Sequence, residues 1–84
     1  MSKIKKVEKF LEDFLKKKER KINLKNLLNK NLVRNGILDS MDIIVLTSNI
    51  NKKFNIQINL ASQTTLKKFE KFRDLVDLIS KKMK

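Results

Sequence analysis

The sequence contains no cysteine and no histidine, and these two absences exclude several kinds of chemistry. Without cysteine the chain forms no disulfide, no thiolate metal site and no cysteine nucleophile, which fits a reducing compartment. Without histidine it has neither a Ser-His-Asp nor a Cys-His arrangement for nucleophilic catalysis. The nine acidic residues form no cluster with metal-ligand spacing. We therefore expect a protein that is not an enzyme, with no catalytic residues and no metal site of its own.

Long apolar runs, proline and glycine are also scarce. The longest unbroken run of large aliphatic residues is Ile43 to Leu46, far short of the roughly 20 residues that span a bilayer. The basic N-terminus leads directly to Glu12 and Asp13, so no apolar core of a secretion signal develops. We expect no transmembrane segment and a cytoplasmic location. A chain of 84 residues can bury one modest core, so we expect residues 1–84 to form a single, monomeric domain.

Basic residues outnumber acidic ones by 21 to 9, which gives a formal net charge of +12. The excess lies at the two ends of the chain, with +7 over residues 1–30 and +6 over residues 52–84, whereas residues 31–51 carry −1. Clustered lysines can neutralise phosphates and bind nucleic acid. A lysine-rich composition can equally line solvated helix faces without any such role. Both interpretations remain open at this stage.

Apolar spacing predicts an all-α domain. A stripe at intervals of three and four residues predicts a first helix from Ile4, with Lys16 to Lys18 at its C-terminal end, where cations oppose the helix dipole. Residues 22–35 mix asparagines with leucines and predict a long connection, with room for one helical turn, held to the core by its leucines. A second long helix is predicted from Ser40 to about Lys53.

The C-terminal third continues the helical pattern. Residues 54–58 alternate like a strand but have no partner strand, so we expect an extended loop that buries Ile56 and Ile58. Ser62 or Thr64 is expected to cap a short helix that ends near Lys68. A final helix is predicted from about residue 72 to residue 82. All five phenylalanines fall at apolar positions of these elements, which favours the core over base stacking.

The most informative segment is residues 36–41, with the sequence Gly-Ile-Leu-Asp-Ser-Met. Gly36 is the only glycine and there is no proline, so this position is the best candidate for a positive φ. Asp39 and Ser40 are both favourable N-cap residues, and we interpret them as an N-cap pair before the second long helix. In that helix the side that carries Ile44 and Val45 falls outside the predicted core. It is either a partner-binding patch or a half-buried helix side.

The order of these parts resembles an acyl carrier protein of the phosphopantetheine-binding carrier superfamily. Residues 36–41 are similar to the family's Gly-x-x-Asp-Ser-Leu attachment motif, with Met41 in place of leucine, a volume-conserving exchange. Residues 54–58 (Phe-x-Ile-x-Ile) and 65–69 (Thr-Leu-x-x-Phe) resemble later segments of the family, as do the apolar residues of 75–79. The resemblance covers most of the chain. It implies an acyl-carrier-like four-helix bundle of three longer helices and one short helix.

The resemblance also implies a function. A 4′-phosphopantetheine arm would be attached covalently to Ser40 by a phosphopantetheinyl transferase, because the chain has no histidine to activate the serine hydroxyl. The arm would carry acyl or aminoacyl groups as thioesters between loading and cargo-processing enzymes, as in fatty acid, polyketide or nonribosomal peptide biosynthesis. Asp39 would help to hold the transferase's metal ion or would simply cap the helix, and the two roles are compatible. The implied partner-docking residues are Met41, Asp42, Ile44, Val45 and Ser48.

One departure from the family concerns charge. Family members usually present an acidic second helix to basic enzyme surfaces, whereas this helix has Asp42 near its start and ends in Lys52 and Lys53. The departure suggests a specialised carrier that uses local acidity at Asp39 and Asp42 together with apolar contact. Two alternatives stay open. One is a small basic helical module that binds nucleic acid or anionic membrane, with Ser40 an ordinary cap; the other is a carrier-like fold that is never modified.

Overall fold

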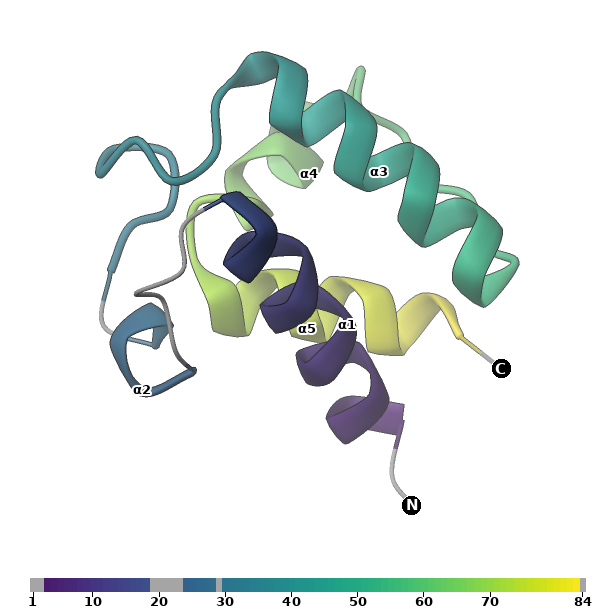
Figure 1. Ribbon diagram of the computed structural model, residues 1–84. Coiled ribbons are helices and arrows are strands. Elements are labelled where there is room, and N and C mark those ends of the chain that lie inside the picture. The colour runs from purple at the N-terminus through teal and green to yellow at the C-terminus, as the bar shows by residue number, and fades with distance from the viewer. Residues whose placement is uncertain (1–2, 19–23, 29, 84) are drawn as a thin grey trace.

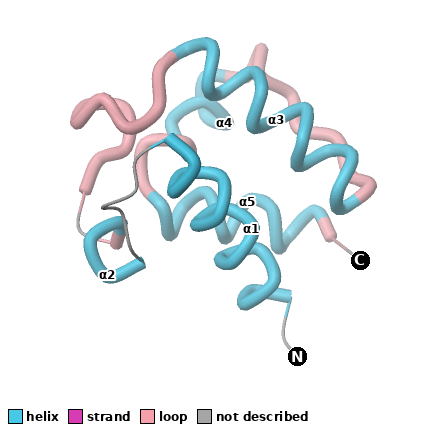
Figure 2. The backbone as a smooth tube through the Cα atoms, in the orientation of Figure 1, coloured by secondary structure: helices cyan, strands magenta, loops and turns pink. Residues whose placement is uncertain are grey.

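The computed structural model describes residues 3–18, 24–28 and 30–83 and shows a helical protein (Figure 1). The three long helices are α1 (Lys3–Lys18), α3 (Ser40–Phe54) and α5 (Phe72–Lys82), and the short ones are α2 (Leu24–Leu27) and α4 (Gln63–Lys68). Loops join them, and the described residues contain no strand (Figure 2). No helix among these residues has the length and apolar character needed to cross a bilayer. The all-α prediction is therefore confirmed.

The helix boundaries follow local signals in the sequence. Helix α4 begins after Ser62, whose hydroxyl accepts a hydrogen bond of 3.4 Å from the backbone N–H of Thr65. Helix α3 ends at Phe54, because the next residue, Asn55, adopts the left-handed conformation with φ of 54° and caps the helix. The boundaries of α5 coincide with the predicted range. Of the two predicted caps for α4, the structure selects Ser62.

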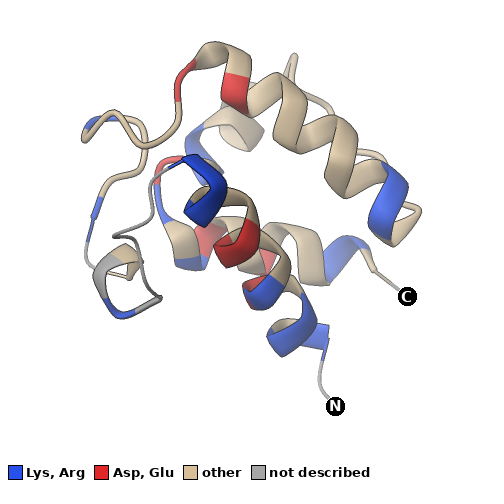
Figure 3. Cartoon of the chain, viewed as in Figure 1, with Lys and Arg blue, Asp and Glu red and all other residues tan. Residues whose placement is uncertain are grey.

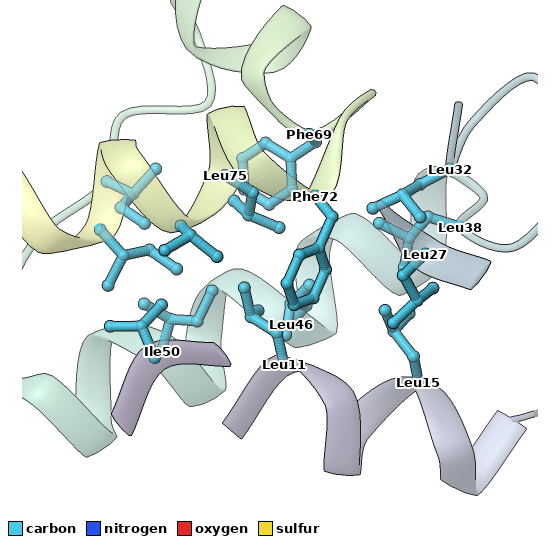
Figure 4. Close-up of a cluster of buried hydrophobic side chains, with 14 residues drawn as sticks. Leu11, Leu15, Leu27, Leu32, Leu38, Leu46, Ile50, Phe69, Phe72 and Leu75 are labelled. Atoms are coloured by element: carbon cyan, nitrogen blue, oxygen red, sulfur yellow. The ribbon is translucent and has the colours of Figure 1, made fainter. Parts of the chain in front are cut away.

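The core lies between the long helices, with α1 and α4 both packed against α5 (Figure 4). Phe69 and Phe72 are fully buried, and Phe10, Phe14 and Phe54 pack against the core from its edge. The prediction that the phenylalanines serve the core is confirmed. The buried aliphatic residues are Val7, Leu11, Leu15, Leu27, Leu32, Leu38, Leu46, Ile50, Ile58, Leu75, Val76 and Ile79.

Two regions differ from the prediction. Ile4 belongs to the predicted core stripe of α1 but is 48% exposed, in the first turn of the helix. The long connection contains the one-turn helix α2, and only some of its apolar residues serve as anchors: Leu27 and Leu32 are buried, whereas Leu28 and Val33 are exposed. Ile22, where this predicted connection began, lies outside the described residues. The long connection is thus held to the core by Leu27 and Leu32.

Candidate functional site

The loop before α3 is fastened to the core by two buried leucines, Leu32 and Leu38. The carbonyl oxygen of Leu32 accepts hydrogen bonds of 2.9 Å from the N–H groups of Ile37 and Leu38, which closes the loop on itself. The N–H of Leu32 donates a 2.6 Å hydrogen bond to the carbonyl of Glu70, at the junction of α4 and α5. The loop is therefore joined both to itself and to the C-terminal helices, which positions the start of α3.

Gly36 lies at the turn of this loop with φ of +74°, as its uniqueness in the sequence predicts. Glycine adopts this conformation without the steric cost that a Cβ atom imposes. A Cβ built at this position meets no atom within 4 Å. The requirement for glycine is therefore one of backbone conformation and not of space.

Asp39 is the N-cap of α3. Its side chain accepts a 2.9 Å hydrogen bond from the N–H of Asp42, and the Asp42 carboxylate accepts a 3.0 Å bond from the N–H of Asp39. This reciprocal capping box satisfies two backbone donors. The expected cap pair is corrected here: Asp39 alone caps the helix and Ser40 is its first helical residue. Asp39 has the extended backbone that places its carboxylate over the first turn.

Ser40 is exposed, and within the described residues its hydroxyl takes part in no hydrogen bond. The capping box uses the N–H of Asp42, and the N–H of Ile43 bonds to the carbonyl of Asp39. The N–H groups of the two preceding residues, Ser40 and Met41, have no acceptor within the helix because it begins there. These donors and the helix dipole create a partial positive charge beside the Ser40 hydroxyl. The backbone of the helix start thus favours an anionic substituent on Ser40, whereas the Asp39 and Asp42 carboxylates oppose it.

Lys18, at the end of α1, contacts both the loop before α3 and the first turn of α3. Its ammonium group forms an ion pair with the Asp42 carboxylate and donates a 3.3 Å hydrogen bond to the carbonyl oxygen of Ile37. One lysine therefore joins α1 to both the loop and the first turn of α3. The pair also offsets the charge of Asp42, so the acidity at this end of α3 is weaker than the sequence alone suggests.

A surface depression of about 370 Å³ opens beside Ser40, between the start of α3, the preceding loop and α4. Its apolar wall is formed by Ile43, Leu66 and Val33, and its polar rim includes Lys67. Leu66 is 39% exposed, and no residue of α4 is buried. A chain attached to Ser40 would find both apolar surface and a cation within this depression. The residues lining it are Val33, Ser40, Ile43, Gln63, Leu66, Lys67 and Glu70.

The outward side of α3 carries an apolar patch immediately after Ser40. Met41 is 66% exposed, Ile44 54% and Val45 47%. Ser48 continues the same side and is also exposed. The opposite side of the helix is buried through Leu46, Thr47 and Ile50. Met41 is thus mostly exposed and Ile44 and Val45 are about half exposed, which fits both interpretations drawn from the sequence, the partner-binding patch and the half-buried helix side. We call Met41, Ile44, Val45 and Ser48 the α3 patch.

The two ends of α3 carry opposite charges (Figure 3). Asp39 and Asp42 lie at the start of the helix, and Lys52 and Lys53 lie in its last turn. The α3 patch lies between them, closer to the acidic end. The helix as a whole thus presents a polarised surface and not an acidic one.

Sequence reasoning identified Ser40, Asp39 and the α3 patch but missed two contributors to the site. Lys18 was assigned only to the end of α1, because no short spacing links it to Asp42. The depression formed by Leu66 and Lys67 was missed because it depends on how α4 sits beside α3. Leu66, the one large apolar residue of α4, is the sequence signal that bears on the depression.

Comparisons with protein-family models, with curated proteins and with solved structures return no match to this chain.

Proposed function

We propose that this chain is a cytoplasmic, stand-alone acyl carrier protein, which carries acyl or aminoacyl intermediates on a 4′-phosphopantetheine arm attached to Ser40. In this role the protein is a carrier and not a catalyst. The single observation that supports the proposal most strongly is the state of Ser40. It is the first residue of a long amphipathic helix, it is exposed, and its neighbour Asp39 performs the capping. A serine that served as the cap would instead accept a hydrogen bond from a backbone N–H of the first turn through its side-chain oxygen.

The residues around Ser40 fit the arm. The phosphodiester that joins the arm to Ser40 is an anion. The N–H groups in the first turn of α3 that have no acceptor in the helix stabilise negative charge at this position. The depression beside Ser40 offers Lys67 to the phosphate region and Ile43, Leu66 and Val33 to an apolar portion. When attached, the arm supplies a terminal thiol that holds the cargo as a thioester. Ser40 would hold the arm, and Asp39 would keep the helix start ordered and help to hold the transferase's metal ion.

The α3 patch is the proposed docking surface for the transferase and for the cargo-handling enzymes. Exposed large apolar side chains gathered beside a functional position favour protein contact. Met41, Ile44 and Val45 supply this contact, with Ser48 and Asp42 at its edge. Because Lys18 pairs with Asp42, we expect docking to depend more on apolar contact than on acidic steering.

The alternative of a basic helical module that binds nucleic acid or membrane rests partly on an assumption that differs from the structure. It treats Ser40 as an ordinary cap, and Asp39 occupies that role. The unmodified-carrier alternative shares every feature of the site and differs only in whether Ser40 accepts the arm. Modification of Ser40 is therefore the property to test.

The test is intact-mass spectrometry after incubation with coenzyme A, magnesium and a broad-specificity phosphopantetheinyl transferase. We expect the parent chain to gain the mass of one phosphopantetheinyl group and the Ser40→Ala variant to gain none. Ser80→Ala is the matched control, because Ser80 is a serine of α5 that lies outside the α3 patch and the depression beside Ser40, and this variant should be modified to completion.

Two outcomes would contradict the proposal. Modification of Ser40→Ala would place the arm elsewhere. Absence of modification in a folded parent chain, with the transferase active on a control carrier, would favour the unmodified fold or the basic module.

A further inference from the structure

A second groove, of about 580 Å³, lies at the end of the molecule where α3 finishes, away from Ser40. We call it the basal groove. It is formed by residues 6–13 of α1, the last turn of α3 and the residue that follows α5. The residues lining it are Lys6, Lys9, Phe10, Asp13, Lys53, Phe54 and Met83. Its volume exceeds that of the depression beside Ser40.

The floor of the basal groove is apolar. The rings of Phe10 and Phe54 meet edge to face, with centroids 5.4 Å apart and an interplanar angle of 76°. Both phenylalanines are only partly buried, and Met83 beside them is partly exposed as well. The floor therefore retains apolar surface that the core does not cover.

The rim of the basal groove is cationic. Lys6, Lys9 and Lys53 are exposed, and none of them forms an ion pair within the described residues. Asp13 is the one acidic residue of the lining, and it forms no ion pair with Lys9 four residues before it. Three ammonium groups around a partly exposed aromatic floor match an amphiphile with an anionic head and an apolar body.

We infer that the basal groove docks this protein on a membrane surface that displays anionic lipid headgroups. Lys6, Lys9 and Lys53 contact headgroup phosphates, and the Phe10 and Phe54 rings face the boundary of the acyl region. Lys53 lies about 20 Å along α3 from Ser40 at 1.5 Å per residue. Docking through this end therefore leaves Ser40 and the α3 patch away from the membrane and accessible to enzymes. The inference does not depend on modification of Ser40.

The test is co-sedimentation of the full chain with vesicles in about 0.1 M sodium chloride, where the Debye length is about 10 Å. One set of vesicles contains phosphatidylcholine alone, and the other contains equal parts of phosphatidylcholine and phosphatidylglycerol. Each lysine near an anionic surface strengthens binding about fivefold. We therefore expect the triple variant Lys6→Gln, Lys9→Gln, Lys53→Gln to lose on the order of 100-fold in affinity for the anionic vesicles.

The matched control is the triple variant Lys25→Gln, Lys30→Gln, Lys71→Gln. These lysines are exposed, lie around α2 and the start of α5, and carry the same total charge. The control should stay within about fivefold of the parent, because charges farther from the surface than about 10 Å are screened. Circular dichroism would establish that both variants are folded. Ser40→Ala should bind the anionic vesicles as the parent does, which separates this test from that of the proposed function.

Several results would overturn the inference. Equal losses in the two triple variants would show a diffuse effect of net charge. Equal binding to both kinds of vesicle, or no binding to either, would remove the anionic headgroup as ligand. Displacement by inorganic phosphate well beyond that by sodium chloride of equal ionic strength would assign the groove to a free anion. Binding of duplex DNA that depends on the same three lysines, without vesicle binding, would assign it to nucleic acid.

Discussion

Lys18, the last residue of α1, forms an ion pair with Asp42 in the first turn of α3, and so connects two helices at one of the two residues of the capping box. The same ammonium group bonds to the carbonyl of Ile37 in the loop before Ser40. The start of α3 is thus held by its own cap and by a residue distant in sequence.

The first prediction concerns this ion pair. Lys18→Gln should lower the free energy of unfolding by about 0.5–1 kcal/mol, a modest figure because the Lys18 side chain is 32% exposed and solvent screens the pair. Urea denaturation would measure it. Lys17→Gln, which removes the same charge from a neighbouring exposed residue without an ion pair in the described chain, should have a smaller effect. Equal effects would mean that the pair contributes nothing.

The second prediction separates the two roles of Asp39. Asp39→Ala should destabilise the protein by about 1 kcal/mol through loss of the cap, whereas Asp39→Asn should cost little because asparagine caps equally well. If the charge also helps to hold the transferase's metal ion, both variants should slow arm attachment at Ser40. Thermal unfolding and the initial rate of modification measure these effects separately. A normal rate for Asp39→Asn would leave Asp39 with capping alone.

The third prediction concerns Thr47, which is buried in α3 at 5% exposure. Its hydroxyl has no hydrogen-bond partner within the described chain. Thr47→Val replaces the hydroxyl with a methyl group of similar size and should raise the free energy of unfolding by about 1 kcal/mol. Thr47→Ser keeps the hydroxyl, removes the methyl and should destabilise by a similar amount, about 1 kcal/mol. Denaturant midpoints would measure both, and a loss of stability in Thr47→Val would indicate a partner for the hydroxyl.

The fourth prediction tests the α3 patch as a docking surface. Ile44→Asp and Val45→Asp should each slow arm attachment by about tenfold, since a carboxylate in an apolar contact is left desolvated and unpaired. The helical circular dichroism signal should stay unchanged because both side chains are about half exposed. Gln57→Asp, an exposed position beyond the end of α3, adds the same charge and should leave the rate unchanged. Unchanged rates in all three variants would remove the patch from the docking surface.

The long helices could be predicted from the sequence because each buries one stripe of apolar side chains. The spacing of Leu46, Thr47 and Ile50 identified the inward side of α3, and Ser40 and Asp39 marked its start. The short-range signals were less decisive. Asp39 and Ser40 are both good cap residues, and only the extended backbone of Asp39 decides which one caps.

Features that depend on distant segments could not be predicted. Lys18 reaches Asp42 with a long, flexible side chain, and residues 19–41 intervene, so no periodic pattern relates the two. The basal groove likewise brings together Lys6, Lys53 and Met83 from three separate parts of the chain. The exposure of Ile4 has a similar cause, because the stripe on α1 continues into a first turn that the other elements leave uncovered.

The hydrogen bond from Leu32 to Glu70 ties together two walls of the depression beside Ser40. Val33, next to Leu32, lines one wall, and Glu70 lines the other. These walls cannot separate independently, since outward movement of α4 must either break this bond or draw the loop along with it. An enlarged depression would therefore be accompanied by a shift of the helix start that bears Ser40. A group that enlarged this depression would in this way also displace the first turn of α3.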